Sequence, residues 1–424
     1  MAFDDAVTFD SRHGRWTRSG SVVSDLIVVI LIVVAIVGAA VGKLFVTALC
    51  GLVLVVAVVS RLWARLAFVD VDYRCFASND RLLAGDVVDL TLVIENRKPL
   101  PVPWLGLTQT VPGGFEIEDR EPDVHRHFGT NEIREATNLG QYERVTYHYR
   151  LRARRRGHFG FGPTRLVSGD IFGFYQARLE LPRQPPGVVV YPRTVPLPDF
   201  DLPSRRPIGD VWSRSQLVDD PLRPSGLREY QTGDAARRID WKATARRDAA
   251  FVRTYDPSVS QRVVILLECN SSFERWRIHP DVLEAAVTAA ASVAARSIEL
   301  GYAVGVVSNG NTSDGLAPAV VAPGAGPNQL TALMTTLAGA GSRSTRPLED
   351  LVARHGPEAL PFGATVVYVA GAFLPPTVEY VTELGRRGHR ILALYVGETD
   401  PPEIPGLPIE DYRAVFLPSG PADA

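Results

Sequence analysis

Two uncharged apolar runs near the N-terminus constrain this chain more than any other feature. They extend over residues 26–42 and 44–60, and only Lys43 separates them. At about 1.5 Å per residue, each run forms a helix of roughly 25 Å, the short end of what spans a bilayer. One helix through both would be about 50 Å long, so the chain is expected to turn at Gly42 and Lys43. The sequence therefore predicts a transmembrane helical hairpin over residues 25–65. Two core helices of a soluble protein or a cleaved signal peptide fit less well, because soluble helices rarely lack a polar face for so long and no small-residue cleavage site ends the stretch.

Basic residues flank the hairpin on both sides. Arg12, Arg15 and Arg18 precede it, Arg61 and Arg65 follow it, and its turn contains Lys43 alone. The positive-inside rule then predicts that both flanks, and the bulk of the chain with them, lie in the cytoplasm. The cysteines agree with a reducing compartment, because Cys50, Cys75 and Cys269 are scattered and form no disulfide framework. The expected localisation is the inner (cytoplasmic) membrane, crossed by two spans.

The rest of the chain divides into segments of different pattern. We expect a cytoplasmic N-terminal tail over 1–24, the hairpin over 25–65, a β-sandwich over 69–196, a linker over 197–226, a signature segment over 227–261, an α/β domain over 262–400 and a C-terminal tail over 401–424. The linker is rich in Pro, Ser and charge and has no sustained period. The net charge of −2 gives no general reason to expect nucleic acid as a partner.

Short alternating runs broken by turn residues fill the segment over 69–196. Residues 86–94 alternate and precede a turn cluster at 96–99, and residues 187–191 close the series. Residues 145–153 place Val145, Tyr147, Tyr149, Leu151 and Ala153 on one face. Strands at this spacing, with no helical period between them, predict an immunoglobulin-like β-sandwich.

Strands and helices alternate in the last part of the chain. Fully apolar runs at 263–267, 303–307, 365–369 and 391–396 are typical of parallel strands covered on both faces, and residues 280–300, 328–337 and 378–387 are predicted helices. This order predicts an open, doubly wound α/β sheet. Ligands of such sheets bind at the carboxyl ends of the strands, which here are the loops after Leu267, Val307 and Val369.

A charged motif precedes the first of these strands. Residues 226–234 read GLREYQTGD, residues 237–242 read RRIDWK and residues 245–247 read ARR. The motif resembles the signature of a family of uncharacterised bacterial membrane proteins that carry a von Willebrand factor A-like domain, and whose genes commonly lie beside those of MoxR-type AAA+ ATPases. The hairpin, the β-rich stretch with its Asp-Ile-Phe-Gly at 170–173 and the α/β domain have counterparts there too.

The signature residues allow two interpretations. They are Arg228, Glu229, Tyr230, Gly233, Asp234, Arg237, Arg238, Asp240, Trp241 and Lys242. One interpretation is a structural clamp of ion pairs that fixes the linker, and the other is a surface on which a partner docks. Charge alone does not choose between them, because exposed ion pairs are weak and buried ones mostly confer specificity. Asp234, which follows Gly233, is a candidate N-cap for a short helix.

The resemblance also implies where a metal site would lie. A von Willebrand A domain that binds Mg²⁺ uses Asp-x-Ser-x-Ser after its first strand, with a Thr and an Asp from later loops, a donor set that suits a hard cation. The corresponding positions here are Glu268, Asn270 and Ser272, of which only Ser272 matches. The strand end at 368–371 offers no carboxylate either. We therefore expect a degenerate site, with no metal and no cofactor.

Two classes of function remain. The first is a non-catalytic membrane-anchored adaptor or scaffold that presents its von Willebrand A-like domain to a cytoplasmic partner, which the resemblance implies is a MoxR-type ATPase. The second is an envelope-related hydrolase or a metal-dependent binding protein. The chain contains no Gly-x-Ser-x-Gly elbow, His-Glu-x-x-His or phosphate loop. His279 and His389 are expected to be surface or capping residues, and Cys269 a plain half-buried cysteine. For the adaptor, the predicted partner-binding residues are Glu268, Asn270, Ser271, Ser272, Asn309, Asn311 and Phe373, with Phe373 as an exposed anchor.

Overall fold

The computed structural model describes residues 15–21, 25–118, 130–183, 187–197, 224–231, 239–245, 250–255, 262–270, 279–310, 319–341 and 346–417. The chain divides into two compact units, one made essentially of the residues up to Arg193 and the other essentially of those after it. The predicted linker at 197–226 lies almost wholly outside the described residues.

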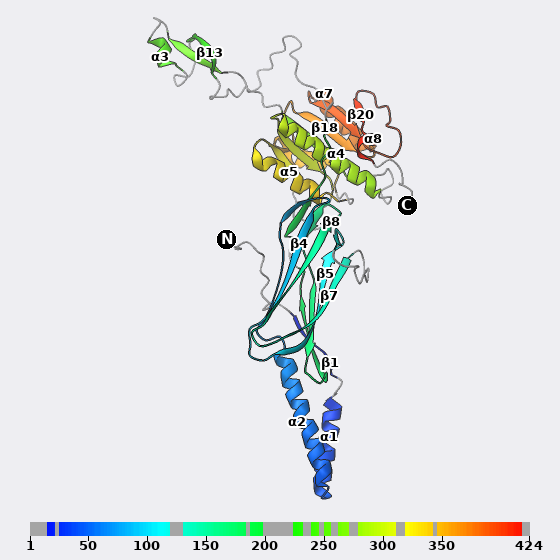
Figure 1. Ribbon diagram of the computed structural model, residues 1–424. Coiled ribbons are helices and arrows are strands. Elements are labelled where there is room, and N and C mark those ends of the chain that lie inside the picture. Colours follow the sequence, from blue (N-terminus) through cyan, green and yellow to red (C-terminus); the bar gives the residue numbers. More distant parts are fainter. Residues whose placement is uncertain are drawn as a thin grey trace. The chain divides into compact units, whose positions relative to one another are not determined.

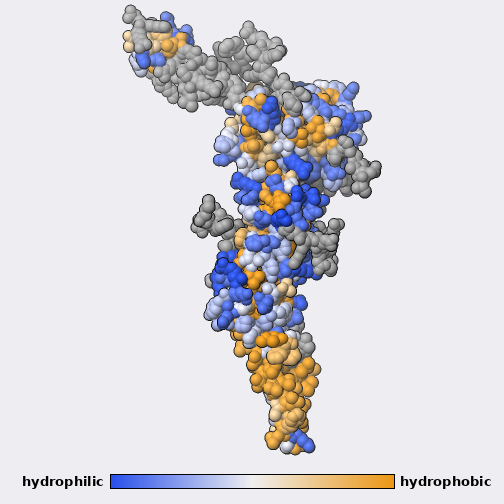
Figure 2. Space-filling view, viewed as in Figure 1, coloured by the Kyte–Doolittle hydropathy of each residue, from blue (hydrophilic) through white to orange (hydrophobic). Residues whose placement is uncertain are grey.

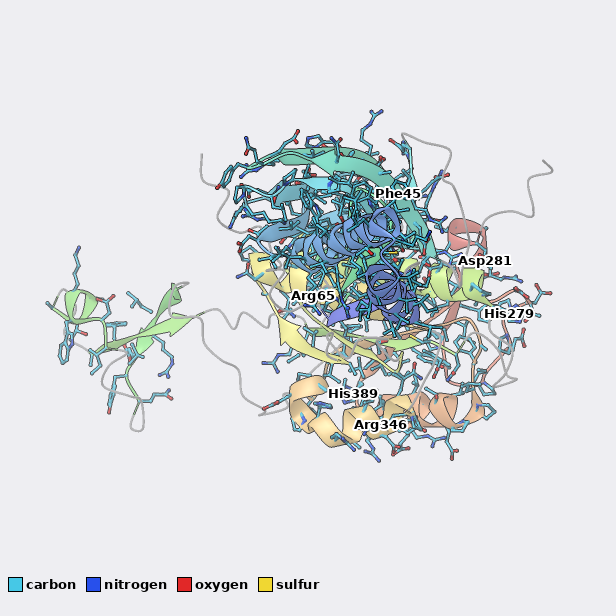
Figure 3. The ribbon with its side chains drawn as sticks, turned by 90° about the horizontal axis from the view of Figure 1, so that it is seen from below. Phe45, Arg65, His279, Asp281, Arg346 and His389 are labelled. Atoms are coloured by element: carbon cyan, nitrogen blue, oxygen red, sulfur yellow. The ribbon has the colours of Figure 1, made fainter. Side chains whose placement is uncertain are left out.

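Two consecutive apolar helices belong to the first unit (Figure 1). They are α1 (Asp25–Ala40) and α2 (Leu44–Leu66). By length and composition α2 is able to cross a membrane, whereas α1 is a shorter apolar helix. Most large apolar side chains of both helices are exposed, and the surface over them is apolar (Figure 2). Phe45 and Arg65, near opposite ends of α2, are labelled in Figure 3.

A glycine lets the two helices approach closely. A Cβ on Gly38 would lie 3.1 Å from the Thr47 hydroxyl of α2, and that hydroxyl donates to the Ala35 carbonyl of α1 at 3.5 Å. Gly42 lies in the turn at a positive φ of 73°. The turn therefore falls at the predicted position, and Gly38 packs as small residues do between membrane helices.

Three sheets make up the rest of the first unit. One has the strand order β1-β11-β10-β5-β7, the second β2-β4-β8-β6 and the third β3-β12-β9. The strands are β1 (Arg15–Ser21), β2 (Val71–Ala77), β3 (Arg81–Leu83), β4 (Val87–Asn96), β5 (Val102–Pro112), β6 (Phe115–Ile117), β7 (Thr130–Leu139), β8 (Arg144–Ala153), β9 (Gly157–Phe159), β10 (Thr164–Gly169), β11 (Tyr175–Leu181) and β12 (Val188–Tyr191). Neighbouring strands of the first two sheets are antiparallel.

One apolar core joins these three sheets, and we call the result the two-sheet domain after its two larger sheets. Alternating side chains of β4 and β8 point into it, with Tyr149, Leu151 and Ala153 buried as the alternation predicts. The core also takes Leu107 and Leu166 from the other large sheet. A buried polar bond crosses it, because the Tyr73 hydroxyl lies 2.6 Å from Oε1 of Gln109. Such a pair satisfies groups that would be costly to bury alone.

The predicted N-terminal tail is partly a strand. β1 pairs antiparallel with β11, in a register that joins Arg15 to Glu180 and Ser21 to Tyr175. The expectation of a mere tail over 1–24 is therefore wrong for residues 15–21. The run RWTRSGS gives no apolar strand signal, and its strand conformation depends on the edge that β11 offers.

The signature segment forms a small antiparallel element. β13 (Pro224–Glu229) pairs with β14 (Phe251–Tyr255), and α3 (Trp241–Thr244) lies between them in sequence. The N-cap of α3 is Asp240, whose carboxylate accepts hydrogen bonds from the backbone N–H groups of Lys242 and Ala243 at 3.0 Å. The predicted N-cap, Asp234, lies outside the described residues.

A six-stranded sheet forms the centre of the second unit. Its order is β17-β16-β15-β18-β19-β20, and all neighbours are parallel except β16 and β17. The strands are β15 (Arg262–Glu268), β16 (Ala303–Ser308), β17 (Val320–Gly324), β18 (Thr365–Ala370), β19 (Arg390–Tyr395) and β20 (Ile409–Asp411), and the helices are α4 (Pro280–Glu299), α5 (Pro327–Gly339), α6 (Leu348–Ala359), α7 (Pro375–Arg386) and α8 (Arg413–Phe416).

Helices pack on the strands of this sheet, and the inner strands β16 and β18 are buried along their whole length. Val264, Leu266 and Tyr368 pack with α6 and α7, whereas α4 contacts β15, β16 and β18. The four predicted parallel strands coincide with β15, β16, β18 and β19, and the three predicted helices with α4, α5 and α7. α6 contains a non-helical residue, Gly356, directly before Pro357.

The α/β domain extends past its predicted end at residue 400. β20 adds a strand parallel to β19, and α8 follows it. The predicted C-terminal tail is therefore wrong for residues 409–416. β20 has only three residues, two of them acidic, so that its sequence carries no strand period.

Candidate functional site

Glu268 is the first side chain at the carboxyl end of the six-stranded sheet. It is the last residue of β15 and only 2% exposed. Its Oε1 accepts hydrogen bonds from Asn270, through the backbone N–H at 3.1 Å and Nδ2 at 2.6 Å, and from Nδ2 of Asn309 at 2.6 Å. Burial raises the pKa of the Glu268 carboxyl above its ordinary value. The carboxyl group is thus tied to two amide side chains of its own chain.

The loop after β16 holds this arrangement in place. Asn309 is buried, and its Oδ1 accepts a hydrogen bond from the backbone N–H of Cys269 at 2.8 Å. That bond fixes the orientation of the Asn309 amide, so that its Nδ2 points to Glu268. The Cys269 thiol is buried and lies 3.4 Å from the Ser308 hydroxyl. Cys269 is therefore fully buried, where the sequence suggested a half-buried cysteine.

Three residues that the sequence analysis missed interact with Glu268 through a close contact or through their charge. The buried Thr377 hydroxyl, in the first turn of α7, lies 3.5 Å from Oε2 of Glu268. The Tyr368 hydroxyl of β18 and Oε2 of Glu349 on α6 are buried without a hydrogen-bond partner among the described residues. Pro375 and Pro376, which start a helix just after a buried strand, were the only sequence signal that this turn reaches the sheet edge.

The described donors do not fit the Mg²⁺ site that the resemblance implies. Mg²⁺ requires several oxygen ligands in a near-octahedral arrangement. Here Oε1 of Glu268 already accepts hydrogen bonds from N–H groups of Asn270 and Asn309, and an N–H donor cannot be a ligand of a cation. Among the described residues no cluster of three or more His, Cys, Asp or Glu side chains could hold a metal ion. Ser271 and Ser272 lie outside that part of the chain.

The prediction that Phe373 is an exposed anchor is wrong. Phe373 is 4% exposed and lies between Tyr368 and Tyr395, with ring centroids at 5.5 Å and 5.4 Å. A side chain after a strand end was expected to face solvent, but the aromatic rings of two neighbouring strands draw it into the core. Asn311 lies outside the described residues, and Glu268 and Asn309 are buried, so the described part of the predicted rim offers little exposed surface.

The signature segment offers more exposed surface. Trp241 is 69% exposed, and the described signature residues Arg228, Glu229, Tyr230 and Lys242 are also exposed. Arg228 donates to the backbone carbonyl of Glu229 at 3.1 Å. Gly233, Asp234, Arg237 and Arg238 lie outside the described residues.

Two histidines stand at the edges of elements, as the sequence predicts. His279 occupies the N-cap position of α4, near Asp281 (Figure 3), and its Nδ1 lies 2.9 Å from Oε1 of Glu398. His389 precedes β19, and burial lowers the pKa of its imidazole.

Comparisons with known proteins point to a bacterial family. The family model described as "Protein of unknown function DUF58" matches residues 226–409. Over 233 residues the chain is 24% identical to "Uncharacterized protein YeaD" of Bacillus subtilis (strain 168), an alignment that covers 54% of each protein. The chain thus spans about half the length of the curated relative it matches. It is similar to an uncharacterised family of bacterial proteins.

Solved structures resemble the chain only distantly. A structure titled "AvmM Catalyzes Macrocyclization in Alchivemycin A Biosynthesis" covers 27% of this chain and 90% of its own, at 15% identity and a TM-score of 0.18. A GH20 exo-β-N-acetylglucosaminidase from Vibrio harveyi covers 38% of this chain and 23% of its own, at 14% identity and a TM-score of 0.20. Scores this low carry no argument about the fold or function of this chain.

Proposed function

We propose that this protein is a membrane-anchored, non-catalytic adaptor that presents its α/β domain to a cytoplasmic partner. The proposal includes the three-part architecture of a hairpin that crosses the inner membrane twice, an immunoglobulin-like β-sandwich and a von Willebrand A-like domain. The exposed apolar side chains of α1 and α2 support the anchor. The parallel sheet with helices packed on its strands supports the domain type.

Amide hydrogen bonds to Glu268 favour a binding role over chemistry at the sheet edge. A general acid or base must reach a substrate proton, but Glu268 is buried and its Oε1 is taken by Asn270 and Asn309. The partner that we propose is a MoxR-type AAA+ ATPase, on the resemblance of the signature residues.

The observation that carries the docking surface is the exposure of Trp241. Large aromatic side chains dominate the binding energy of many interfaces, and a partner removes them from water. Trp241 lies within the residues matched by the family model, and Tyr230 and Leu227 of the same element are exposed as well. We therefore propose that the ATPase contacts the signature segment, with Trp241 as the anchor.

Binding of a purified MoxR-type ATPase to the full chain in detergent micelles tests this surface. We expect Trp241→Ala to weaken binding about 30-fold, which corresponds to about 2 kcal/mol for a buried aromatic anchor. Because Trp241 is exposed, its loss should leave the melting temperature nearly unchanged.

Phe362→Ala is the matched control, since Phe362 is an aromatic residue of the α/β domain that is 70% exposed. It should bind the ATPase as the wild type does. Wild-type affinity of Trp241→Ala would show that the docking surface lies elsewhere. No binding by the wild type would refute the proposed partner itself.

A further inference from the structure

The loop between β10 and β11 exposes two large apolar side chains. Ile171 is 63% exposed and Phe172 is 60% exposed. The loop contains the Asp-Ile-Phe-Gly motif at 170–173, to which the adaptor function gives no role. Exposed apolar residues that lie together on a surface often mark a site of interaction.

Buried hydrogen bonds fix this loop in one conformation. The Asp170 carboxylate is buried and accepts hydrogen bonds from the backbone N–H groups of Phe172 at 3.0 Å and Tyr175 at 2.7 Å. The Trp104 indole donates to the Asp170 carbonyl at 3.2 Å, and Gly173 adopts a positive φ of 74°. These hydrogen bonds therefore hold Ile171 and Phe172 outward, so the loop loses no further conformational entropy when these side chains contact a partner.

The loop lies at the end of the two-sheet domain where the helices begin. Tyr175, just after the loop, pairs with Ser21 of β1, and Ser21 lies four residues before the start of α1 at Asp25. On the other side, α2 contacts β10 and β11. β1 and α1 can be followed together at this end in Figure 1.

A second exposed aromatic residue lies at the same end. Tyr142, in the turn between β7 and β8, is 66% exposed, and its backbone N–H donates to the Lys98 carbonyl at 3.4 Å. The buried Lys98 ammonium in turn donates to the carbonyls of Ala67 and Val69, just past α2, at 2.8 Å each. The Tyr142 turn is thus tied to the end of α2.

Exposed apolar surface continues from α2 towards these loops. Leu62, Leu66 and Val69 are exposed at the end of α2, beside Arg61 and Arg65. Aromatic and basic side chains that gather at the end of an apolar helix are typical of the headgroup level of a bilayer. If these loops faced only water, their exposed apolar and aromatic side chains would contribute no favourable free energy.

We propose that the loops with Ile171, Phe172 and Tyr142 insert into the headgroup–acyl boundary of the membrane in which α1 and α2 are anchored. The occupant of this surface is phospholipid, with anionic headgroups beside Arg61 and Arg65. The two-sheet domain then rests on the bilayer instead of standing away from it on a flexible tether. The inference rests on the proposed membrane anchor and adds a second, peripheral contact to it.

Environment-sensitive fluorophores on introduced cysteines test the contact, in the full chain reconstituted into vesicles of equal parts phosphatidylcholine and phosphatidylglycerol. The native thiols are buried, so labelling reports the introduced ones. Phe172→Cys and Tyr142→Cys probe the loops, and Val55→Cys, on the exposed apolar face of α2, probes the anchor. Asp80→Cys is the matched control, because the exposed Asp80 lies beyond the far end of β2, which extends about 20 Å from Val71.

The result expected is that lipid carrying a nitroxide near its headgroup quenches most of the fluorescence at residues 172 and 142, while aqueous iodide quenches little. Asp80→Cys should show the reverse. If Val55→Cys is quenched by lipid but the loop labels respond to iodide, the loop insertion is wrong and the anchor stands. Loop labels shielded from both quenchers would mean that protein covers them, which also overturns the proposal. If Val55→Cys is not quenched by lipid either, the membrane anchor itself fails.

Discussion

At the residue scale, Glu268 shows how one buried carboxyl group at the end of a strand can be structural. Its partners Asn270 and Asn309 donate N–H groups, and the neighbouring Thr377 contributes a hydroxyl. Donors of this kind stabilise an oxygen acceptor whether or not it carries charge. At residue 268, the folded state therefore requires a side chain that places a hydrogen-bond acceptor within reach of these donors, and the negative charge matters less.

Glu268→Gln and Glu268→Ala should separate these requirements. Gln keeps the acceptor for Asn270 and Asn309, so we expect the free energy of unfolding at neutral pH to be unchanged or slightly higher. Ala leaves both amides without a partner, and we expect a loss of about 2–4 kcal/mol. Urea unfolding in micelles measures both variants.

The pH dependence of the same variants has a definite sign. Burial raises the folded-state pKa of Glu268, so its contribution to stability is present below the unfolded pKa of about 4.3 and is lost as the pH rises through the folded value. Relative to Glu268→Gln, the wild type should become less stable as the pH rises through the folded-state pKa of Glu268.

Added Mg²⁺ should leave the melting temperature of the wild type unchanged. An increase in the melting temperature that Glu268→Ala abolishes would show a working cation site.

Sequence could predict the position of these residues better than their exposure. The apolar strands, which alternate with helices along the sequence, placed Glu268 and Asn309 correctly at strand ends. Both ends lie at the same edge of the sheet, because the strands are parallel. It could not show that Phe373 packs between Tyr368 and Tyr395, since that contact joins residues of neighbouring strands that are distant in sequence. The missed Thr377 depends in the same way on where α7 docks.

At the element scale, Lys98 connects α2 to the two-sheet domain. Its ammonium donates to the carbonyls of Ala67 and Val69, where a helix end leaves acceptors unsatisfied and where positive charge is favourable. The backbone N–H of Arg97 adds a bond to the Asp70 carbonyl at 2.8 Å. The junction is thus fixed by hydrogen bonds.

Lys98→Met should weaken this junction in a pH-dependent way. Burial lowers the pKa of Lys98 to about 8, below the unfolded value of about 10.4. Between these two pH values the unfolded state binds more protons than the folded state. The free energy of unfolding of the wild type should therefore rise with pH across this window, and this gain should be lost as the pH falls through about 8. Lys98→Met cannot titrate and should lack this rise, and at the upper end of the window it should be less stable by about 1–3 kcal/mol for two lost hydrogen bonds.

Urea unfolding followed by near-ultraviolet circular dichroism checks the Lys98 prediction. Lys242→Met is the control, because Lys242 is exposed and its replacement should leave the stability nearly unchanged. A Lys98→Met curve parallel to that of the wild type would mean that the ammonium of Lys98 is not desolvated in the folded protein.

Elements with strong periods were predictable, and short ones were not. The runs at 263–267 and 365–369 coincide with β15 and β18 because burial on both faces demands unbroken apolar sequence. β1 and β20 are polar, and each depends on hydrogen bonds to a strand already in place. Such edge strands have no local signal, since their stability comes from pairing.

At the scale of the whole molecule, β1 determines what the hairpin can do. β1 precedes α1 in the chain, and β11, with which it pairs, follows α2. Both ends of the hairpin therefore join one folded domain. Since a folded domain with polar strand edges cannot extend through hydrocarbon, the residues before α1 and after α2 belong on one side of any membrane that the helices enter. The charge pattern predicts the same topology independently, through the arginines on both flanks.

Reporters of compartment should bear out this topology in living cells. A reporter that is active only in the cytoplasm should be active when fused before Arg15 and equally when fused after Ala424. Lys43→Cys, in the turn between α1 and α2, should be modified by a membrane-impermeant thiol reagent from the outer side, with Asp80→Cys as the unreactive control.

The lengths of α1 and α2 are about 24 Å and about 35 Å at 1.5 Å per residue. α1 therefore spans the hydrocarbon layer only if the bilayer thins slightly or if charged side chains at the helix ends extend to the bilayer surface. Fusions that report opposite compartments would mean that one helix alone spans the membrane and that β1 cannot pair with β11. Cytoplasmic fusions with an unreactive Lys43→Cys would mean that the hairpin enters the bilayer without crossing it.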